Sequence, residues 1–225
     1  MAQGIAQVLT YAVGVAISPV PIIAIVLMLF TAQSRENASA FVVGWAAALA
    51  VVSGVAYVVA DVGDAATDTS ASDTISWAQI VLGVIFLLLA VRAWSKRPKP
   101  GAEAELPAWM AGIDSFTAVK SFGLAVVLVA VNPKNLLLSL GAGSSLAQLG
   151  VSTSTAVVSL AVFVVLASVT IAGPLVYTLV RGDRADEQLQ AVKGWLVLHN
   201  GAVMTVLFVV LGVDLISKGL PLFGR

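Results

Sequence analysis

The sequence has 225 residues, of which 59% are hydrophobic and 11% charged, and its mean hydropathy is +1.00. Soluble domains carry about 25% charged residues, so this composition excludes an ordinary soluble domain and predicts an all-α polytopic membrane protein. The net charge is zero, and the absence of cysteine excludes disulfides and thiol chemistry. With one histidine in addition, the composition disfavours a metal or redox centre.

Six apolar segments are long enough to cross a bilayer, which takes about 20 residues in a helix. The first lacks a basic region before its apolar run, so we expect a retained helix and not a cleaved signal peptide. The fourth and fifth exceed one span, which predicts that each is tilted, broken or extended beyond the membrane. In chain order the segments are 5–31, 39–60, 75–94, 118–147, 153–180 and 195–216.

The loops between these segments differ in charge. Lysine and arginine follow the first, third and fifth segments, and neither follows the second or fourth. Because basic loops remain in the cytoplasm, both termini are predicted outside. The loop after the second segment carries Asp61, Asp64, Asp68 and Asp73. Their irregular spacing favours a solvated loop over a site for a divalent cation.

Two related halves are predicted, 1–94 and 116–225, joined by a cytoplasmic linker over 95–115 that is rich in proline and charge. The first segment contains AISPVPIIAIVL and the fourth AVNPKNLLLSL, which share a small residue, a polar cap-type residue, a proline and an aliphatic run. Three helices in each half give the halves opposite orientations. The pattern therefore predicts six transmembrane helices as a 3+3 inverted repeat with broken helices 1 and 4.

The prolines in these two motifs interrupt their helices. Proline lacks an N–H and clashes with the carbonyl four residues before it, so Pro19 and Pro21 free the carbonyls of Val15 and Ile17. In the fourth segment, Pro133 frees that of Val129. The preceding Ser18 and Asn132 are preferred N-cap residues, and proline is favoured at the first helical position. Each motif therefore predicts a new half-helix, whose N-terminus is suited to binding an anion.

Lys134 lies in the first turn of the second of these half-helices. A lysine at a helix centre costs about 2.5–3.5 kcal/mol on membrane insertion. An anionic group bound between Lys134 and the exposed N–H groups would offset that cost. The alternative is structural: Lys134 extends to an interface or pairs with a carbonyl that a proline has freed.

Other polar and aromatic residues support weaker expectations. His199 and Asn200 in the sixth segment are candidates to line the same cavity, although His199 is equally explained as an interhelical hydrogen-bond donor. Pro174 in the fifth segment predicts a plain kink. The tryptophans are expected mainly at membrane interfaces; they are Trp45, Trp77, Trp94, Trp109 and Trp195.

No enzymatic motif is present: the sequence has no P-loop, no dinucleotide fingerprint and no Ser–His–Asp candidate. We therefore expect no catalytic residue, no enzymatic activity, no cofactor, no metal and no nucleic-acid partner. With no ATP site, active transport would require an ion gradient or a partner.

The proline pair, the Asn-Pro-Lys motif and the six-helix repeat together resemble the LysE superfamily of exporters. The first motif of that group usually reads P-G-P, whereas this chain has P-V-P at Pro19–Pro21. The chain resembles more closely the actinobacterial GAP family of glycolipid- and sulfolipid-addressing proteins. The stretches that carry this likeness are 17–30, 36–45, 132–138, 162–169 and 211–220.

This resemblance implies a role in moving a cell-envelope glycolipid or a lipid-linked anionic sugar across an actinobacterial plasma membrane. The positions of this chain that match the family motifs are Ser18, Pro19, Pro21, Asn132, Pro133, Lys134 and Asn135. The first hypothesis is a flippase that binds the headgroup of a membrane lipid or glycolipid at the paired half-helix N-termini. The alternatives are a LysE-type exporter of an amino acid or organic anion, and a non-transporting scaffold for a glycolipid biosynthesis or export complex. A homo-oligomer is a further open alternative.

Overall fold

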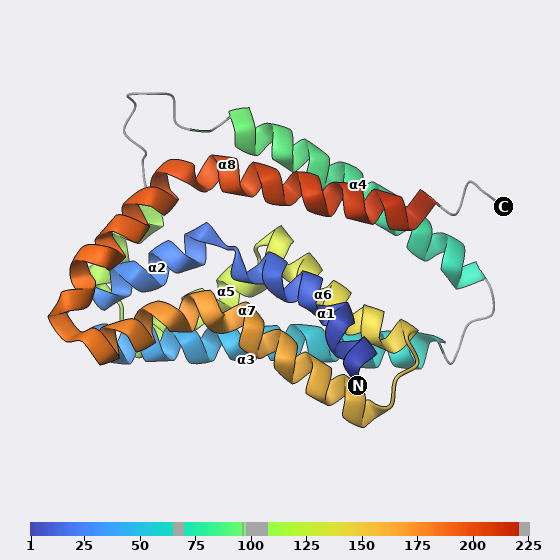
Figure 1. Cartoon of the computed structure of the whole chain (residues 1–225), viewed down its shortest axis with the longest axis horizontal. Coiled ribbons are helices and arrows are strands. Elements are labelled where there is room, and N and C mark those ends of the chain that lie inside the picture. Colours follow the sequence, from blue (N-terminus) through green and yellow to red (C-terminus); the bar gives the residue numbers. More distant parts are fainter. Residues whose placement is uncertain (65–69, 96, 98–107, 221–225) are drawn as a thin grey trace. The chain divides into compact units, whose positions relative to one another are not determined.

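The computed structural model describes residues 1–64, 70–95, 97 and 108–220. Every regular element in these ranges is helical, which confirms the predicted all-α class. The elements in chain order (Figure 1) are α1 (Ala2–Ala16), α2 (Pro19–Leu29), α3 (Ser34–Asp64), α4 (Ser70–Ser95), η1 (Ala108–Ser115), α5 (Ala118–Ala130), α6 (Pro133–Gln148), α7 (Thr153–Arg181), η2 (Gly182–Ala185) and α8 (Asp186–Gly219).

Three single helices, α3, α7 and α8, are long and apolar enough to cross a membrane. Two further spans consist of bent pairs: α1 and α2 meet at 58°, and α5 and α6 at 72°. The predicted breaks in the first and fourth apolar segments are therefore confirmed. The described part of the chain accounts for three to five spans, because Ile80–Ser95 of α4 is a shorter apolar helix. The six-span repeat stays a prediction.

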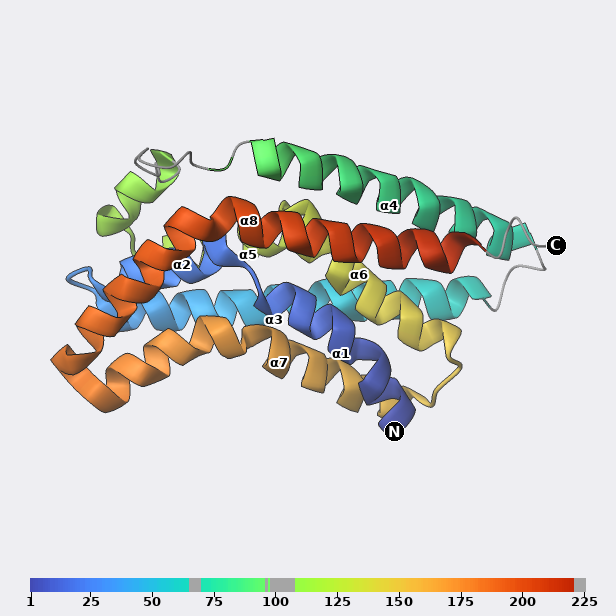
Figure 2. The same ribbon diagram turned by 45° about the horizontal axis from the view of Figure 1, so that its top comes forward.

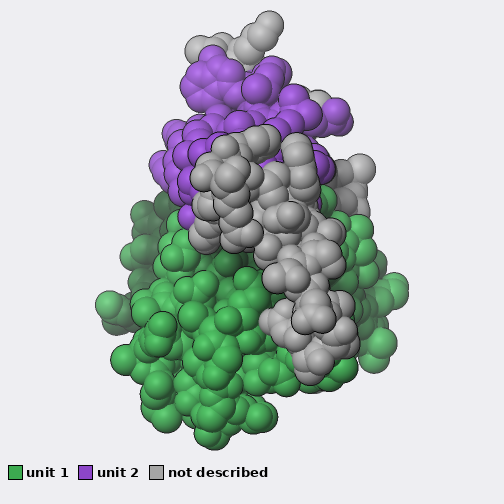
Figure 3. Space-filling view, turned by 90° about the vertical axis from the view of Figure 1, so that its right-hand side faces the viewer, with its two compact units in different colours: residues 1–65, 106–194 green, residues 66–105, 195–225 purple. Residues whose placement is uncertain are grey.

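The chain forms two compact units, coloured separately in Figure 3. Unit 1 consists of Met1–Ala65 and Leu106–Gly194, and unit 2 of Ala66–Glu105 and Trp195–Arg225. These units do not coincide with the predicted halves 1–94 and 116–225, whose division stays a prediction. Asp68 of the acidic loop and residues 98–107 of the predicted linker lie outside the described residues.

Unit 1 gathers the two bent pairs around α3 and α7. Figures 1 and 2 show α3 running alongside α7, and α3 also packs on α5 and α6. The crossing of α6 over α3 is exceptionally close. A β-carbon on Gly143 would overlap the backbone carbonyl of Ser53 and would lie 2.8 Å from the backbone nitrogen of Tyr57. Backbone therefore meets backbone at this crossing, as small residues allow in membrane bundles.

Unit 2 contains α4 and most of α8, which also approach each other through glycine. A β-carbon on Gly83 would lie 2.7 Å from the carbonyl oxygen of Gly212, and one on Gly212 would lie 2.9 Å from that of Gly83. Phe86 and Phe208 pack beside this contact with ring centroids 5.6 Å apart. Close backbone approach and this aromatic contact therefore both contribute to the packing of α4 on α8.

The tryptophans divide into buried and exposed sites. Trp45 is fully buried in unit 1, where its indole N–H points to a backbone carbonyl of α7 at 3.4 Å, so its predicted interfacial position is wrong. Trp94 and Trp195 expose 50% and 53% of their surface. The side chains of Trp77 and Trp109 lie outside the described residues.

Candidate functional site

The break between α1 and α2 follows from the two prolines. The last helical hydrogen bond of α1 joins the Ile17 N–H to the Val13 carbonyl at 3.0 Å. Pro19 and Pro21 have no N–H, so the helical partners of the Val15 and Ile17 carbonyls are absent. The Ser18 N–H turns to the Ala16 carbonyl at 3.0 Å, which also removes the helical partner of the Gly14 carbonyl. A row of carbonyls at the C-terminal end of α1 is thereby left without helical N–H donors.

Lys134 of α6 binds this row. Its ammonium group donates to the carbonyl oxygens of Gly14 at 2.7 Å and Ile17 at 2.9 Å, and to the Ser18 hydroxyl at 2.6 Å. An ammonium group has three hydrogens, so all of its donors are used. The side chain is 1% exposed. Lys134 therefore closes the end of a helix that lies 116 or more residues away in the chain.

Two hydroxyl groups complete the same helix end. Ser18 donates to the Val15 carbonyl at 2.6 Å, and Thr170 of α7 donates to the Ala16 carbonyl at 2.6 Å. Together with the two bonds from Lys134, every carbonyl from residue 14 to residue 17 accepts a hydrogen bond from a side chain. The donors come from three separate elements. The break is thus stabilised by tertiary contacts, as irregular backbone inside a membrane requires.

The break between α5 and α6 is closed by residues of its own segment. The side-chain oxygen of Asn132 accepts from the backbone N–H of Lys134 at 3.1 Å, which makes Asn132 the predicted N-cap, with Pro133 at the first helical position. The side-chain amide of Asn135 donates to the Leu128 carbonyl at 3.0 Å, one residue before the carbonyl that Pro133 was predicted to free. These bonds span no more than seven residues.

The two breaks lie against each other. The Ser18 hydroxyl is 3.0 Å from the side-chain oxygen of Asn135, in addition to its contact with Lys134. The exposed fractions of Ser18, Lys134 and Asn135 are 2%, 1% and 0%. Three of the predicted site residues therefore form one buried polar cluster, which we call the break cluster.

The helix N-termini in this cluster offer few donors. Pro19 and Pro21 remove two of the first three N–H groups of α2, and Pro133 removes the first of α6. Ser18 occupies the N-cap position of α2 but makes no capping hydrogen bond, because its hydroxyl turns back to α1. The structure thus shows Lys134 paired with freed carbonyls. Ligand binding by the predicted site residues stays a prediction.

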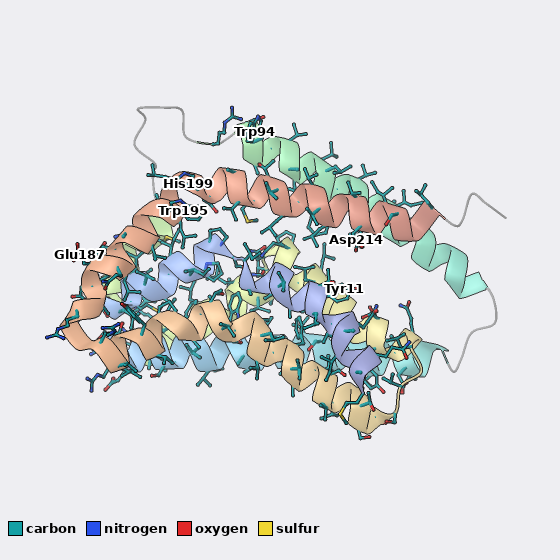
Figure 4. All side chains as sticks on the ribbon, in the orientation of Figure 1. Tyr11, Trp94, Glu187, Trp195, His199 and Asp214 are labelled. Carbon is teal, nitrogen blue, oxygen red and sulfur yellow. The ribbon has the colours of Figure 1, made fainter. Side chains whose placement is uncertain are left out.

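The last two predicted site residues, His199 and Asn200, lie in unit 2. A ring nitrogen of His199, Nδ1, is 2.8 Å from the Trp195 carbonyl, and the two rings stack with centroids 4.7 Å apart. Figure 4 labels both side chains on neighbouring turns of α8. Asn200 follows on the same helix. The expectation that His199 and Asn200 line one cavity with the break cluster therefore stays a prediction.

The electrostatics of the break cluster are unusual, because every acceptor of the Lys134 ammonium is formally neutral. Within the described residues, no group of three or more His, Asp or Glu side chains is arranged to hold a metal ion. Two residues that take part in closing the end of α1 were missed by sequence reasoning. Gly14 contributes only a backbone carbonyl, which leaves no signal in the sequence. Thr170 contributes its hydroxyl, and the available signal was a polar side chain within the apolar fifth segment.

Comparison with known families gives one result. The chain matches the family model described as Sap, sulfolipid-1-addressing protein (SfLAP), over residues 8–221. The match extends over both units and includes both breaks. No curated protein and no solved structure matches the chain.

Proposed function

Because the chain belongs to the sulfolipid-1-addressing protein family, we propose that it is a transporter or flippase for an anionic glycolipid or lipid-linked sugar of the cell envelope. Family membership supports a role in handling glycolipids or sulfolipids, and the membrane helices supply the setting for it. The proposed location is the bacterial plasma membrane, with both chain termini outside.

The composition of the two units supports an inverted repeat as the transport scaffold. From residues 1–94, a bent pair and α3 belong to unit 1, and α4 belongs to unit 2. From residues 116–225, a bent pair and α7 enter unit 1, and most of α8 lies in unit 2. The same distribution of elements from both halves is expected of a duplicated transporter in which each half contributes equivalent parts.

The observation that carries the proposal is the buried ammonium of Lys134, whose three hydrogen-bond acceptors are all formally neutral. Ionisable groups inside a membrane usually mark the path of a substrate or ion. A sulfate or phosphate headgroup would supply the missing negative charge and accept charge-assisted hydrogen bonds from Lys134. In the proposed mechanism the headgroup replaces the α1 carbonyls as the acceptor, while its lipid tails remain in the bilayer.

Translocation in proteoliposomes tests this proposal. Fluorescent sulfated and neutral glycolipids are placed in both leaflets, and the fraction that an external quencher reaches is followed over time. We expect rapid exchange of the sulfated lipid by the wild-type protein and a loss of about tenfold in Lys134→Gln, equivalent to about 1.4 kcal/mol. The matched control is Lys120→Gln, at an exposed lysine in the first turn of α5.

The outcomes separate the three hypotheses. A folded Lys134→Gln protein that moves the sulfated lipid at the wild-type rate would contradict headgroup binding at the break cluster. Uptake of a small radiolabelled amino acid or organic anion, with no lipid exchange, would indicate the soluble-metabolite exporter. If the wild-type protein moves neither class of molecule, the scaffold hypothesis is favoured.

A further inference from the structure

Three oxygen atoms surround the Lys134 ammonium at the C-terminal end of α1, and we call this group the cage. They are the carbonyl oxygens of Gly14 and Ile17 and the hydroxyl oxygen of Ser18, at 2.6 to 2.9 Å from the nitrogen. Carbonyls at a helix C-terminus carry the negative end of the helix dipole. Such carbonyls, together with unwound backbone, coordinate alkali cations in broken-helix transporters. Ammonium and potassium ions are similar in size, so the cage has the dimensions of a monovalent cation site.

Lys134 is the main hydrogen-bond donor to the oxygen atoms of the cage. Ser18 has one hydroxyl hydrogen and two acceptors within reach, the Val15 carbonyl at 2.6 Å and the Asn135 side-chain oxygen at 3.0 Å. With that hydrogen directed to either acceptor, the lone pairs of the Ser18 oxygen face the ammonium. Removal of the ammonium therefore leaves an electron-rich cage without a donor.

The backbone cannot replace those donors. The helical partner of the Ile17 carbonyl would be the N–H of residue 21, which is a proline. The helical partner of the Gly14 carbonyl would be the Ser18 N–H, which binds the Ala16 carbonyl instead. Buried carbonyls without partners are costly, so an occupant must enter when the ammonium leaves.

We propose that the C-terminal end of α1 is a monovalent cation site, with Gly14, Ile17 and Ser18 as its oxygen ligands. The Lys134 ammonium is its resident cation, and a potassium or sodium ion occupies the cage when the ammonium leaves. A step that rests on the proposed function follows: when Lys134 turns to an anionic headgroup, entry of an alkali cation keeps the break closed and couples the headgroup to the ion.

The variant Lys134→Met tests the site without reference to transport. Methionine keeps an unbranched side chain of nearly the same length and lacks the ammonium, so the cage loses only its resident cation. The midpoint of thermal unfolding is measured in detergent at constant ionic strength, with potassium, sodium or N-methyl-D-glucamine as the cation. We expect the midpoint of Lys134→Met to rise by about 3 °C in the best alkali cation, because a ligand that binds the folded state stabilises it.

The controls separate this effect from general salt effects. Wild type and Lys120→Met should have the same midpoint in all three salts, because in both the cage is filled by Lys134. Lys134→Met should also bind ⁸⁶Rb⁺ in a one-to-one ratio. Adding Ser18→Ala to that variant removes one of the three ligands and should weaken ⁸⁶Rb⁺ binding by about tenfold, equivalent to about 1.4 kcal/mol.

Equal midpoints in all three salts, together with no ⁸⁶Rb⁺ binding, would overturn the proposal and indicate that water fills the cage. If Lys134→Met does not purify as a folded protein, Lys134→Ala is prepared with methylammonium chloride, an ammonium small enough for the enlarged site. Rescue of folding by methylammonium and not by choline supports the cage, and rescue by neither contradicts it. Each result is independent of the glycolipid assay, so the site and the proposed function can fail separately.

Discussion

The two helix breaks share a sequence motif but are stabilised in different ways. At the α5–α6 break, Asn132 and Asn135 bind backbone groups within seven residues of themselves. At the α1–α2 break, the carbonyls of α1 depend on Lys134 and Thr170, which lie more than 100 residues away. The α1–α2 break has one local side-chain donor, Ser18, and depends on distant residues for its other carbonyls. The α5–α6 break is closed locally, and its Lys134 also donates to the α1–α2 break.

The residues of the two motifs account for part of this difference. At the P-V-P motif, the Ser18 hydroxyl binds the Val15 carbonyl and makes no capping bond, and Pro21 removes the N–H at the third helical position of α2. At the N-P-K-N motif, the Asn132 oxygen accepts from the N–H of Lys134 at the second helical position, and the Lys134 side chain extends to the α1–α2 break. The α1–α2 break is therefore expected to be the more sensitive of the two to substitutions outside its own segment.

The largest expected effect is at Lys134. In a buffer with N-methyl-D-glucamine as the cation, Lys134→Met should lower the free energy of unfolding by about 2 kcal/mol, because two buried carbonyls lose their donor. Relief of the desolvation cost of the ammonium offsets part of the loss. Detergent-based thermal or chemical unfolding measures the change. Lys120→Met, at an exposed site, should remain within about 0.5 kcal/mol of wild type.

Ser18→Ala should cost about 1.5 kcal/mol, because it removes both an acceptor for Lys134 and the donor to the Val15 carbonyl. The matched control is Ser139→Ala. Ser139 is equally buried, but its hydroxyl binds a carbonyl of its own helix at 2.8 Å. Unfolding measured as for Lys134 should show a clearly smaller loss for the control. Equal losses would mean that the interhelical role of Ser18 adds nothing.

Thr170→Val should cost about 1 kcal/mol, because the substitution keeps the shape of the side chain and removes the donor to the Ala16 carbonyl. Thr178→Val provides the comparison, since the Thr178 hydroxyl binds the Pro174 carbonyl within α7 at 3.0 Å. Unfolding curves of the two variants should differ by more than the measurement error. If they coincide, α7 does not stabilise the α1–α2 break.

The smallest effect is expected at the locally closed break. Asn132→Ala should cost about 0.5–1 kcal/mol through loss of one N-cap, and Asn132→Ser should restore most of it. The same unfolding assay measures both variants. If Asn132→Ala lowers the free energy of unfolding more than Lys134→Met does, the α5–α6 break is the more sensitive of the two.

Much of the fold could be predicted from apolar length and proline position. The first segment became α1 and α2, and the fourth became α5 and α6, with each second half-helix beginning at a proline. The freed carbonyls of Val15 and Ile17 were also predictable, because a proline removes the donor four residues after each. Local covalent chemistry determines these features, so no tertiary information was needed.

The partners of those carbonyls could not be predicted in the same way. The sequence left open whether Lys134 binds an anion or pairs with a backbone carbonyl, because the answer depends on contacts between distant segments. Ser18 was expected to cap α2, but Pro21 removes one of the N–H groups that it would bind. Trp45 was expected at an interface and is buried instead, because the packing around it is a tertiary property.

The contact at Gly143 has a consequence for the position of Lys134 on the same helix. No side chain separates α6 from the Ser53 carbonyl there, so any side chain added at Gly143 would push α6 away from α3. Nine residues separate Gly143 from Lys134, a distance of about 14 Å along the helix axis. A turn of about 10° around the crossing would displace the lysine end by roughly 2 Å. A substitution at Gly143 that tilts α6 by this amount would therefore take the Lys134 ammonium out of hydrogen-bonding distance of the α1 carbonyls.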